Sequence, residues 1–259
     1  MVNLYKKIVL SGINRKFLLP VVLLTIAGSI LFSVIGYLTI QREVTEDAEE
    51  IARVTAQKIQ ITISVRIEKW MSEIALMASS KEASGSDLKE IVEYLKEKRS
   101  ILSDYLFLHA ADKDGYYLTT DGRTSNISNR EYFNKAMKGI SSVSDPLISK
   151  TTGKPVIAVC APRRNNKGEI IGALTGIIDL KQITKIINSE RILKTGYSIM
   201  IDNKGTVMAY PDEASIMKFS LLNIDDQGTK EIVRSMLKGN SGVGYYTYKG
   251  QKKLAAYCP

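Results

Sequence analysis

Residues 17–40 read FLLPVVLLTIAGSILFSVIGYLTI, an apolar run without a single charged side chain. At about 1.5 Å per residue, a helix of this length exceeds the ~30 Å hydrocarbon core of a bilayer. The run is also longer than the ~7–15 apolar residues of a cleaved signal peptide, and residues 36–41 offer no small-residue cleavage site. We therefore expect residues 17–40 to form a transmembrane helix.

The charges on either side of this run predict its orientation. Four cations and no acid precede it, whereas five acids and one cation lie in residues 41–50. An excess of Lys and Arg marks the cytoplasmic flank of a membrane span. We expect residues 1–16 to be cytoplasmic and residues 41–259 to be extracytoplasmic, which makes this a single-pass cell-membrane protein. The cations are Lys6, Lys7, Arg15 and Lys16, and the acids are Glu43, Glu46, Asp47, Glu49 and Glu50.

The composition argues against nucleic acid and against a metal site. The formal net charge is +9, but the extracytoplasmic part mixes Lys and Arg with all 27 acids instead of clustering cations. Nucleic-acid binding usually requires a clustered basic face. His109 is the only histidine, so no Cys/His metal spacing exists, and we expect no cofactor. Cys160 and Cys258 lie in apolar runs, which fits two free, buried thiols better than a disulfide.

Residues 43–80 have the periodicity of one long helix that continues from the membrane span. Apolar residues recur at three- and four-residue steps with charges between them, and no Pro or Gly interrupts. Such a helix often pairs with a second copy of itself, so we expect a homodimer; packing of the apolar stripe on its own domain is the alternative. A second helix is predicted at residues 88–98, which gives a helical region over residues 41–100.

Two sequence patterns then recur in the same order. YLFLHAADKDGYYL (105–118) and YSIMIDNKGTVM (197–208) both read as strand, tight turn and strand, with an Asp shortly before a Gly. KPVIAVCAP (154–162) likewise resembles KKLAAYCP (252–259). Such self-similarity predicts two tandem α+β modules, over residues 101–190 and 191–259.

The first module continues through residues 163–179, a turn and a long apolar strand that is expected at the centre of its sheet. The second copy reaches Pro259 where the equivalent strand would begin. A sheet without a central strand leaves backbone groups unpaired and apolar area exposed. We therefore expect the second module to be incomplete.

NISNREYFNKAMKG (126–139), VSDPLISKTTGKP (143–155) and the strand ending at Asp179 together resemble the double Cache (dCache) sensor of bacterial methyl-accepting chemotaxis receptors. The resemblance covers nearly the whole chain. It implies a transmembrane helix, a long helix and two PAS-like antiparallel sheets. It also implies extracytoplasmic small-molecule sensing and transmembrane signalling in chemotaxis, without catalysis. In such receptors a second span, a HAMP module and a cytoplasmic signalling rod follow.

The resemblance also implies a ligand site in the first, membrane-distal module, where an amino acid or related carboxylate is the expected ligand. Arg130 matches the carboxylate-binding Arg of the family, and Asp179 matches its ammonium-binding Asp. Tyr132 stands where amino-acid binders usually carry Trp. Asp145, Leu147 and Ser149 complete the predicted set, in which Leu147 replaces a usual Tyr and Ser149 replaces a second usual Asp.

Plainer roles remain open for the same residues. Arg130 could form a surface ion pair with Glu131 or Asp145, which would contribute little stability. Asp179 could cap a helix predicted at residues 181–188. We interpret His109 and Trp70 as packing residues.

Other classes of function are less well supported by the sequence. A hydrolase needs a positioned base with a nucleophile or a metal, and no such pattern is present. A sensor of a histidine kinase or of a cyclic-dinucleotide synthase, or a stub without a signalling role, remains an alternative to the chemoreceptor.

Overall fold

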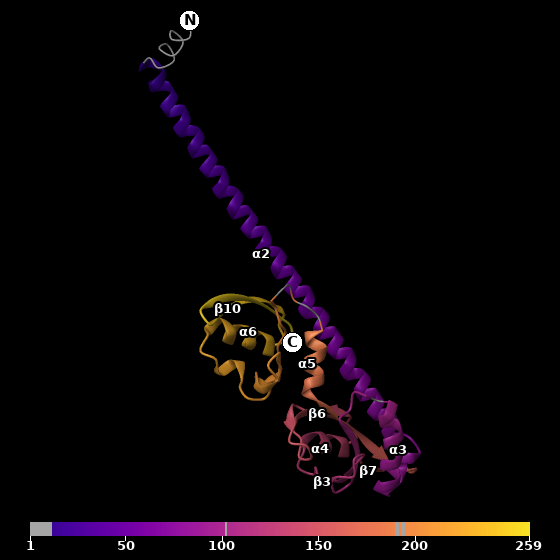
Figure 1. The fold of residues 1–259 in the computed structure, drawn as a ribbon. Coiled ribbons are helices and arrows are strands. Elements are labelled where there is room, and N and C mark those ends of the chain that lie inside the picture. The colour runs from indigo at the N-terminus through magenta and orange to yellow at the C-terminus, as the bar shows by residue number, and fades with distance from the viewer. Residues whose placement is uncertain (1–11, 102, 190–191, 193–194) are drawn as a thin grey trace. The chain divides into compact units, whose positions relative to one another are not determined.

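The computed structural model describes residues 12–101, 103–189, 192 and 195–259. The chain divides into two compact units, residues 1–50 and residues 51–259. Helix α2 (Gly12–Ala78) starts in the first unit and ends in the second (Figure 1). Within the described residues, one helix is long and apolar enough to span a membrane, and it covers Leu18–Ala78. Most of the residues predicted to be cytoplasmic, 1–11, lie outside the described part.

In the first unit, α2 exposes the apolar side chains of the predicted span. Phe32 is 80% exposed and Leu24 is 77% exposed. A soluble helix normally buries one apolar face, whereas a helix surrounded by lipid is apolar all round. The exposed surface therefore fits a membrane anchor.

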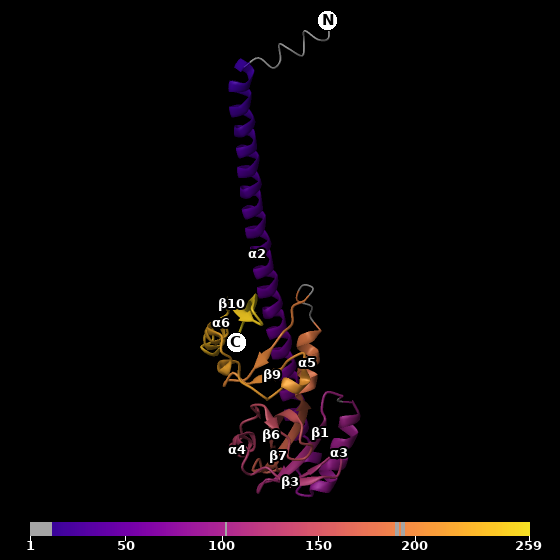
Figure 2. The same ribbon diagram turned by 60° about the vertical axis from the view of Figure 1, so that its left-hand side comes forward.

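The second unit contains a seven-stranded antiparallel sheet. The strand order is β3-β2-β1-β7-β6-β4, and β5 also pairs with β6. Figure 2 labels β1, β3, β6 and β7 of this sheet. β7 pairs with β1 on one side and with β6 on the other, so the predicted central position of residues 163–179 is confirmed. The strands are β1 (Phe107–Asp112), β2 (Tyr116–Thr119), β3 (Thr124–Asn126), β4 (Ser142–Val143), β5 (Leu147–Ile148), β6 (Pro155–Arg164) and β7 (Ile170–Asp179).

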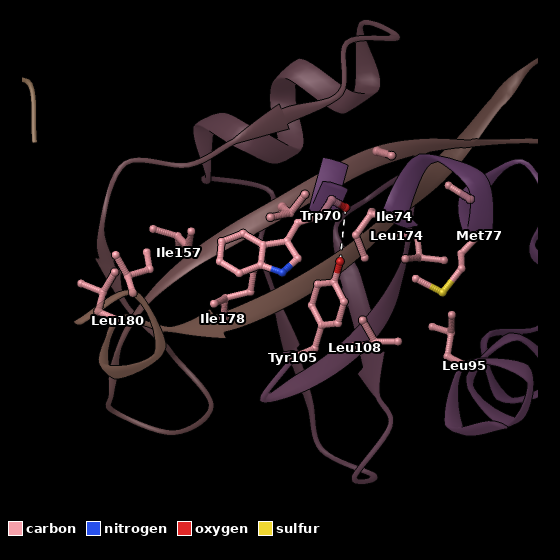
Figure 3. Packing of buried hydrophobic residues seen from close by; sticks show 14 of the residues in the cluster. Trp70, Ile74, Met77, Leu95, Tyr105, Leu108, Ile157, Leu174, Ile178 and Leu180 are labelled. Atoms are coloured by element: carbon pink, nitrogen blue, oxygen red, sulfur yellow. Dashed lines mark hydrogen bonds between the residues drawn. The ribbon is translucent and has the colours of Figure 1, made fainter. Parts of the chain in front are cut away.

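Both faces of this sheet are buried, in two separate cores. Alternate residues of β6 divide between them: Val156, Ala158 and Cys160 face one core, and Ile157 and Val159 face the other. Helices α2, α3 (Leu88–Ile101) and α5 (Leu180–Asn188) cover the larger core, which Figure 3 shows. The short helix α4 (Glu131–Met137) covers the smaller core. A strand buried on both faces reads as a continuous apolar run, as β6 and β7 do.

A hydrogen-bonded aromatic pair joins α2 to the sheet. The Tyr105 hydroxyl oxygen lies 3.2 Å from the Trp70 carbonyl oxygen (Figure 3). It also lies 2.9 Å from Glu73 Oε2, and its single proton is donated to one of these two acceptors. The Trp70 indole Nε1 donates to Asp104 Oδ2 at 2.9 Å. A Cβ at Gly176 of β7 would lie 2.4 Å from Tyr105 Cε1, so glycine at this position leaves room for the ring. The interpretation of Trp70 as a packing residue is confirmed.

The predicted internal repeat is visible in the hydrogen bonds of the two hairpins. Asp112 Oδ1 accepts from the backbone N–H groups two and four residues later, at 3.0 and 2.9 Å. Asp202 Oδ1 accepts from the equivalent N–H groups, both at 2.8 Å. Gly115 and Gly205 then adopt positive φ, +82° and +75°, which a side chain would disfavour. Both modules therefore use one Asp-to-Gly turn.

The strands of the second module form two separate sheets, whereas those of the first module form one. Strands β8 (Met200–Ile201) and β9 (Val207–Ala209) form one two-stranded sheet, and β10 (Gly242–Tyr248) and β11 (Gln251–Tyr257) form another. Within residues 195–259 no strand joins the two hairpins as β7 joins the halves of the first module. The helical elements are η2 (Glu213–Ser215), η3 (Leu221–Asn223) and α6 (Gln227–Leu237), and in the first module η1 (Glu82–Ser84).

Both cysteines are free thiols. Cys160 is buried in β6, where burial raises its pKa to about 12. Cys258 is half-buried, and its Sγ donates to the Ala56 carbonyl at 3.4 Å. Of the two thiols that were expected to be buried, Cys160 is buried and Cys258 is not fully so.

Candidate functional site

A small cavity lies in the first module, on the face of the sheet that α4 covers. Its volume is about 20 Å³, which is room for roughly one water molecule. Strands β1, β2, β5 and β7, helix α4 with the loop before it, and the turn between β5 and β6 all contribute to its wall. The lining residues are Phe107, His109, Tyr117, Ile127, Arg130, Tyr132, Leu147, Ser149, Lys150, Thr151 and Ile177.

Four of the six predicted site residues line this cavity. Arg130 and Tyr132 reach it from the start of α4, and Leu147 and Ser149 reach it from β5 and the turn after it. These residues come from two stretches of sequence that β6 holds side by side, because β5 pairs with β6 and α4 packs on β6 and β7. A binding role for them stays a prediction.

Arg130 makes neither of the ion pairs that the sequence left open. Glu131 pairs with Lys135 at 2.9 Å, and Asp145 lies 3.9 Å from Lys204. Arg130 Nη2 instead donates to the Ile148 carbonyl at 3.2 Å, and no carboxylate in the described part of the chain forms a salt bridge with it. A half-buried guanidinium without a counter-ion keeps most of its donors available for an anion.

The turn between β5 and β6, residues 149–154, forms a polar rim over the cavity. The buried Ser149 hydroxyl oxygen accepts from the N–H groups of Thr151 at 3.3 Å and Thr152 at 3.2 Å. The hydroxyls of Thr151 and Tyr117, which both line the cavity, share a hydrogen bond of 2.7 Å. Lys150 Nζ donates to the Asn126 carbonyl and to Asn129 Oδ1, at 2.9 and 3.0 Å. Two cations, Arg130 and Lys150, therefore border one cavity.

Aromatic rings form much of the wall. The His109 ring lies 4.3 Å from the Tyr117 ring and 6.3 Å from the Phe107 ring, measured between centroids. Tyr132 is buried, and this burial, followed by the nearby Cys160, raises the pKa of its hydroxyl, whereas Arg130 acts in the opposite direction. Aromatic walls with a few polar groups are typical of small-molecule sites.

His109 has a larger part in this site than the packing role predicted for it. It is 1% exposed, and its Nδ1 has no hydrogen-bond partner among the residues that the structure describes. Burial lowers the pKa of its imidazole to about 3, so the ring is neutral at physiological pH. The alternation of side chains along β1 could have placed His109 at the cavity, since Phe107 and His109 fall on the same face of the strand. For Lys150 and Thr151, no sequence pattern indicated a place at the cavity.

Asp145 and Asp179 are not among the lining residues. Asp179 ends β7 and begins α5, where its Oδ1 accepts from Lys181 N at 2.9 Å. This is the helix-capping role that the sequence left open for it. Asp145 is exposed on the segment between β4 and β5.

A wider depression of about 580 Å³ lies between the start of α3 and strands β2 and β3. Its lining residues include Asp87, Lys89 and Ser125, and all of the lining residues except Tyr117 are exposed or half-buried. Small-molecule sites bury most of the ligand surface and converge on a few polar groups. The cavity beside Arg130 meets this description better.

Comparison with known proteins gives the family to which this fold belongs. The chain belongs to the Cache domain family, whose dCache_1 model matches residues 37–259. It is 25% identical over 259 residues to the methyl-accepting chemotaxis protein PctB of Pseudomonas aeruginosa, an alignment that covers 95% of this chain and 38% of PctB. The chain spans little more than a third of the length of the curated relatives it matches.

Two solved structures share the fold. The ligand-binding domain of the Pseudomonas fluorescens chemoreceptor CtaA, in complex with L-serine, matches with a TM-score of 0.61 and 19% identity, covering 83% of this chain and 89% of that domain. The extracellular domain of a candidate histidine kinase, mmHK1S-Z2, matches with a TM-score of 0.64 and 16% identity, covering 83% and 92%. The expected fold, a long N-terminal helix with Cache-type antiparallel sheets, is confirmed.

The neutral, buried His109 predicts a pH-dependent stability. The unfolded imidazole takes up a proton near its ordinary pKa of 6.5, whereas the folded ring resists protonation down to about pH 3. The unfolded state therefore binds more protons below pH 6.5, and stability falls as the pH falls. We expect the free energy of unfolding to decrease by about 2 kcal/mol between pH 7.5 and 5.

Urea denaturation of the full chain in detergent micelles measures this change. His109→Phe keeps a ring against Tyr117 and removes the only imidazole of the chain, so its stability should stay nearly constant over the same range. An equal loss of stability in wild type and His109→Phe would assign the effect to other groups.

Proposed function

We propose that this chain is the extracytoplasmic sensor region of a membrane chemoreceptor, and that it binds a small carboxylate-bearing molecule in the cavity beside Arg130. The observation that carries the proposal is the guanidinium of Arg130, half-buried at an aromatic cavity without a salt bridge in the described residues. Support comes from PctB, a methyl-accepting chemotaxis protein, and from CtaA, which is a chemoreceptor solved with L-serine.

A guanidinium binds a carboxylate through two parallel N–H···O bonds, which fixes the orientation of the ligand as well as its position. The aromatic side chains of Phe107, Tyr117 and Tyr132 would then enclose the rest of the molecule. Since Asp145 and Asp179 lie outside the lining, their predicted ligand roles depend on rearrangement around a bound molecule.

Binding requires the cavity to open. A volume of about 20 Å³ is far below the roughly 300 Å³ or more of a typical small-molecule pocket. We propose that the turn of residues 149–154 is the part of the wall that moves, since side-chain hydrogen bonds of Lys150 and Thr151 join it to the rest of the cavity wall and could be exchanged for contacts to a ligand. Ligand entry would exchange these contacts for contacts to the ligand, and the resulting displacement is the proposed signal.

Removal of the guanidinium should weaken binding strongly. Arg130→Ala deletes a charge-assisted, partly desolvated contact, for which we expect a loss of about 2–4 kcal/mol, or roughly 30- to 1000-fold in affinity. Calorimetry with a hit from a thermal-shift screen of metabolites measures the change. Arg164→Ala serves as the control, since Arg164 is exposed and binds the Gly168 carbonyl away from the cavity. A hit that binds wild type and Arg130→Ala equally would disprove the site.

The membrane topology is part of the same proposal. With residues 1–16 cytoplasmic and residues 41–259 outside, a cysteine placed at the exposed Ser86 in a Cys160→Ala, Cys258→Ser background should react with an impermeant maleimide on intact cells. A cysteine at Asn3, which lies outside the described residues, should react only after the cells are lysed. The reverse labelling pattern would invert the topology.

We also propose a homodimer through α2. In the second unit, Ile51, Val54, Ile61 and Val65 expose large apolar side chains on one side of the helix, and Ile61 is 61% exposed. Steps of three, seven and four residues are those of the a and d positions of a coiled coil. A second copy of α2 is the occupant that this spacing fits.

Disulfide crosslinking in membranes tests the dimer. In the background without native cysteines, Ile61→Cys lies on the apolar stripe and should crosslink to a second copy under mild oxidation. Gln60→Cys is equally exposed to solvent but lies about 100° round the helix, so it should crosslink much less. Equal crosslinking at both positions would reflect collision and not a defined interface.

A histidine-kinase sensor is the second candidate, because the extracellular domain of mmHK1S-Z2 matches the fold with a TM-score of 0.64. The same fold serves both kinds of receptor, so the sensor does not define the output. The encoding genomic region, read for a kinase or a chemotaxis signalling sequence, separates the two.

A further inference from the structure

We infer that the cavity beside Arg130 selects carboxylic acids that carry no ammonium group, with an apolar or aromatic body. The inference rests on the proposed function, namely that this cavity is the ligand site, and adds the chemical class of the ligand. The inferred ligand class differs from that of CtaA, whose structure contains the amino acid L-serine.

The charges around the cavity are all of one sign. Among the lining residues, every one of which the structure describes, Arg130 and Lys150 are cations and none is an acid. The oxygens that face Lys150 are neutral, the Asn126 carbonyl and Asn129 Oδ1. The local field therefore favours an anion and opposes a second positive charge.

The carboxylates nearest in sequence to the site have other partners. Asp179 caps α5 through Lys181 N. Asp121 forms a salt bridge with Arg123, which also lies over the Phe107 ring at 5.4 Å. Glu131 pairs with Lys135 on the outer side of α4. None of these acids lines the cavity, so a ligand ammonium that entered would lose its hydration and would gain a counter-charge only if one of these acids left its present partner.

The polar groups inside the cavity do not replace that missing carboxylate. His109 is neutral because its burial lowers the imidazole pKa to about 3, so the ring offers hydrogen bonds but no charge. The Ser149 oxygen already accepts from two backbone N–H groups, and the Tyr117 hydroxyl is engaged with Thr151. The remaining wall is apolar, from Phe107, Ile127, Leu147 and Ile177. This surface fits a hydrocarbon or aromatic body.

Matched pairs of ligands test the inference directly. Calorimetry at pH 7 on the full chain in detergent micelles would compare each of a series of acids with the amino acid of the same skeleton, such as 3-phenylpropanoate with L-phenylalanine and 4-methylpentanoate with L-leucine. In each pair of which at least one member binds, we expect the acid to bind at least tenfold more tightly than the amino acid. We expect the primary amide of the same acid to bind at least tenfold more weakly than the acid. Binding that favours the amino acid would overturn the inference.

The outcomes separate this inference from the proposed function. Arg130-dependent binding with a preference for amino acids would leave the site in place and remove only the ligand class. Binding that is unchanged in Arg130→Ala, or no binding across both series, would contradict the site and with it the inference.

A second variant tests the missing carboxylate itself. Ser149→Asp adds an acid to the lining, and its carboxylate can still accept from the N–H groups of Thr151 and Thr152. We expect the preference for the acid over the amino acid to shrink at least tenfold. Ser149→Asn, similar in size and neutral, should keep the wild-type preference. An unchanged preference in a folded Ser149→Asp protein, judged by circular dichroism, would show that charge at the cavity does not set the selectivity.

Discussion

The first module depends on the position of β7 between β1 and β6. β7 pairs along its length with both neighbours, from Gly172 opposite Asp112 to Asp179 opposite Val156, and so joins the early strands of the module to the late ones. Two glycines make this placement sterically feasible. A Cβ at Gly172 would lie 2.0 Å from the Ala111 carbonyl oxygen, and one at Gly176 would enter the Tyr105 ring. Residues 195–259 contain no such strand, and there the two hairpins stay in separate sheets.

Because the sheet is a single layer, the cavity and the long helix lie on opposite sides of the same strands. In β1, Phe107 and His109 line the cavity, while Leu108 and Ala110 face the core that α2 covers. The buried guanidinium of Arg163 adds a second link: it donates to the carbonyls of Ala83 and Gly85 after α2, at 2.9 and 3.1 Å, and to Ala111 of β1 at 2.9 Å. Burial lowers its pKa to about 10, so it keeps its charge at neutral pH. A displacement of β1 therefore has a direct physical route to α2.

The periodic and repetitive features of the sequence predicted most of the fold. The apolar run at residues 17–40, the stripe of the long helix and the paired Asp-to-Gly hairpins each have a local physical cause, and each is present in the structure. The site was predictable in part. The family resemblance predicted four of the lining residues: Arg130, Tyr132, Leu147 and Ser149. Three further lining residues are brought to the cavity by the pairing of β5 with β6 and of β1 with β2, which the motifs do not contain: His109, Lys150 and Thr151. Asp179 shows the limit of motif transfer, since an Asp at the start of a helix serves equally well as a cap.

A ligand that enters the cavity on the α4 face should act on α2 through the sheet that separates them. Amide hydrogen exchange of the full chain, with and without the tightest-binding acid, measures this effect. We expect slower exchange in residues 105–112 and 147–155, together with a change in residues 66–78 of α2. Slower exchange confined to residues 195–259, with the first module unaffected, would contradict it.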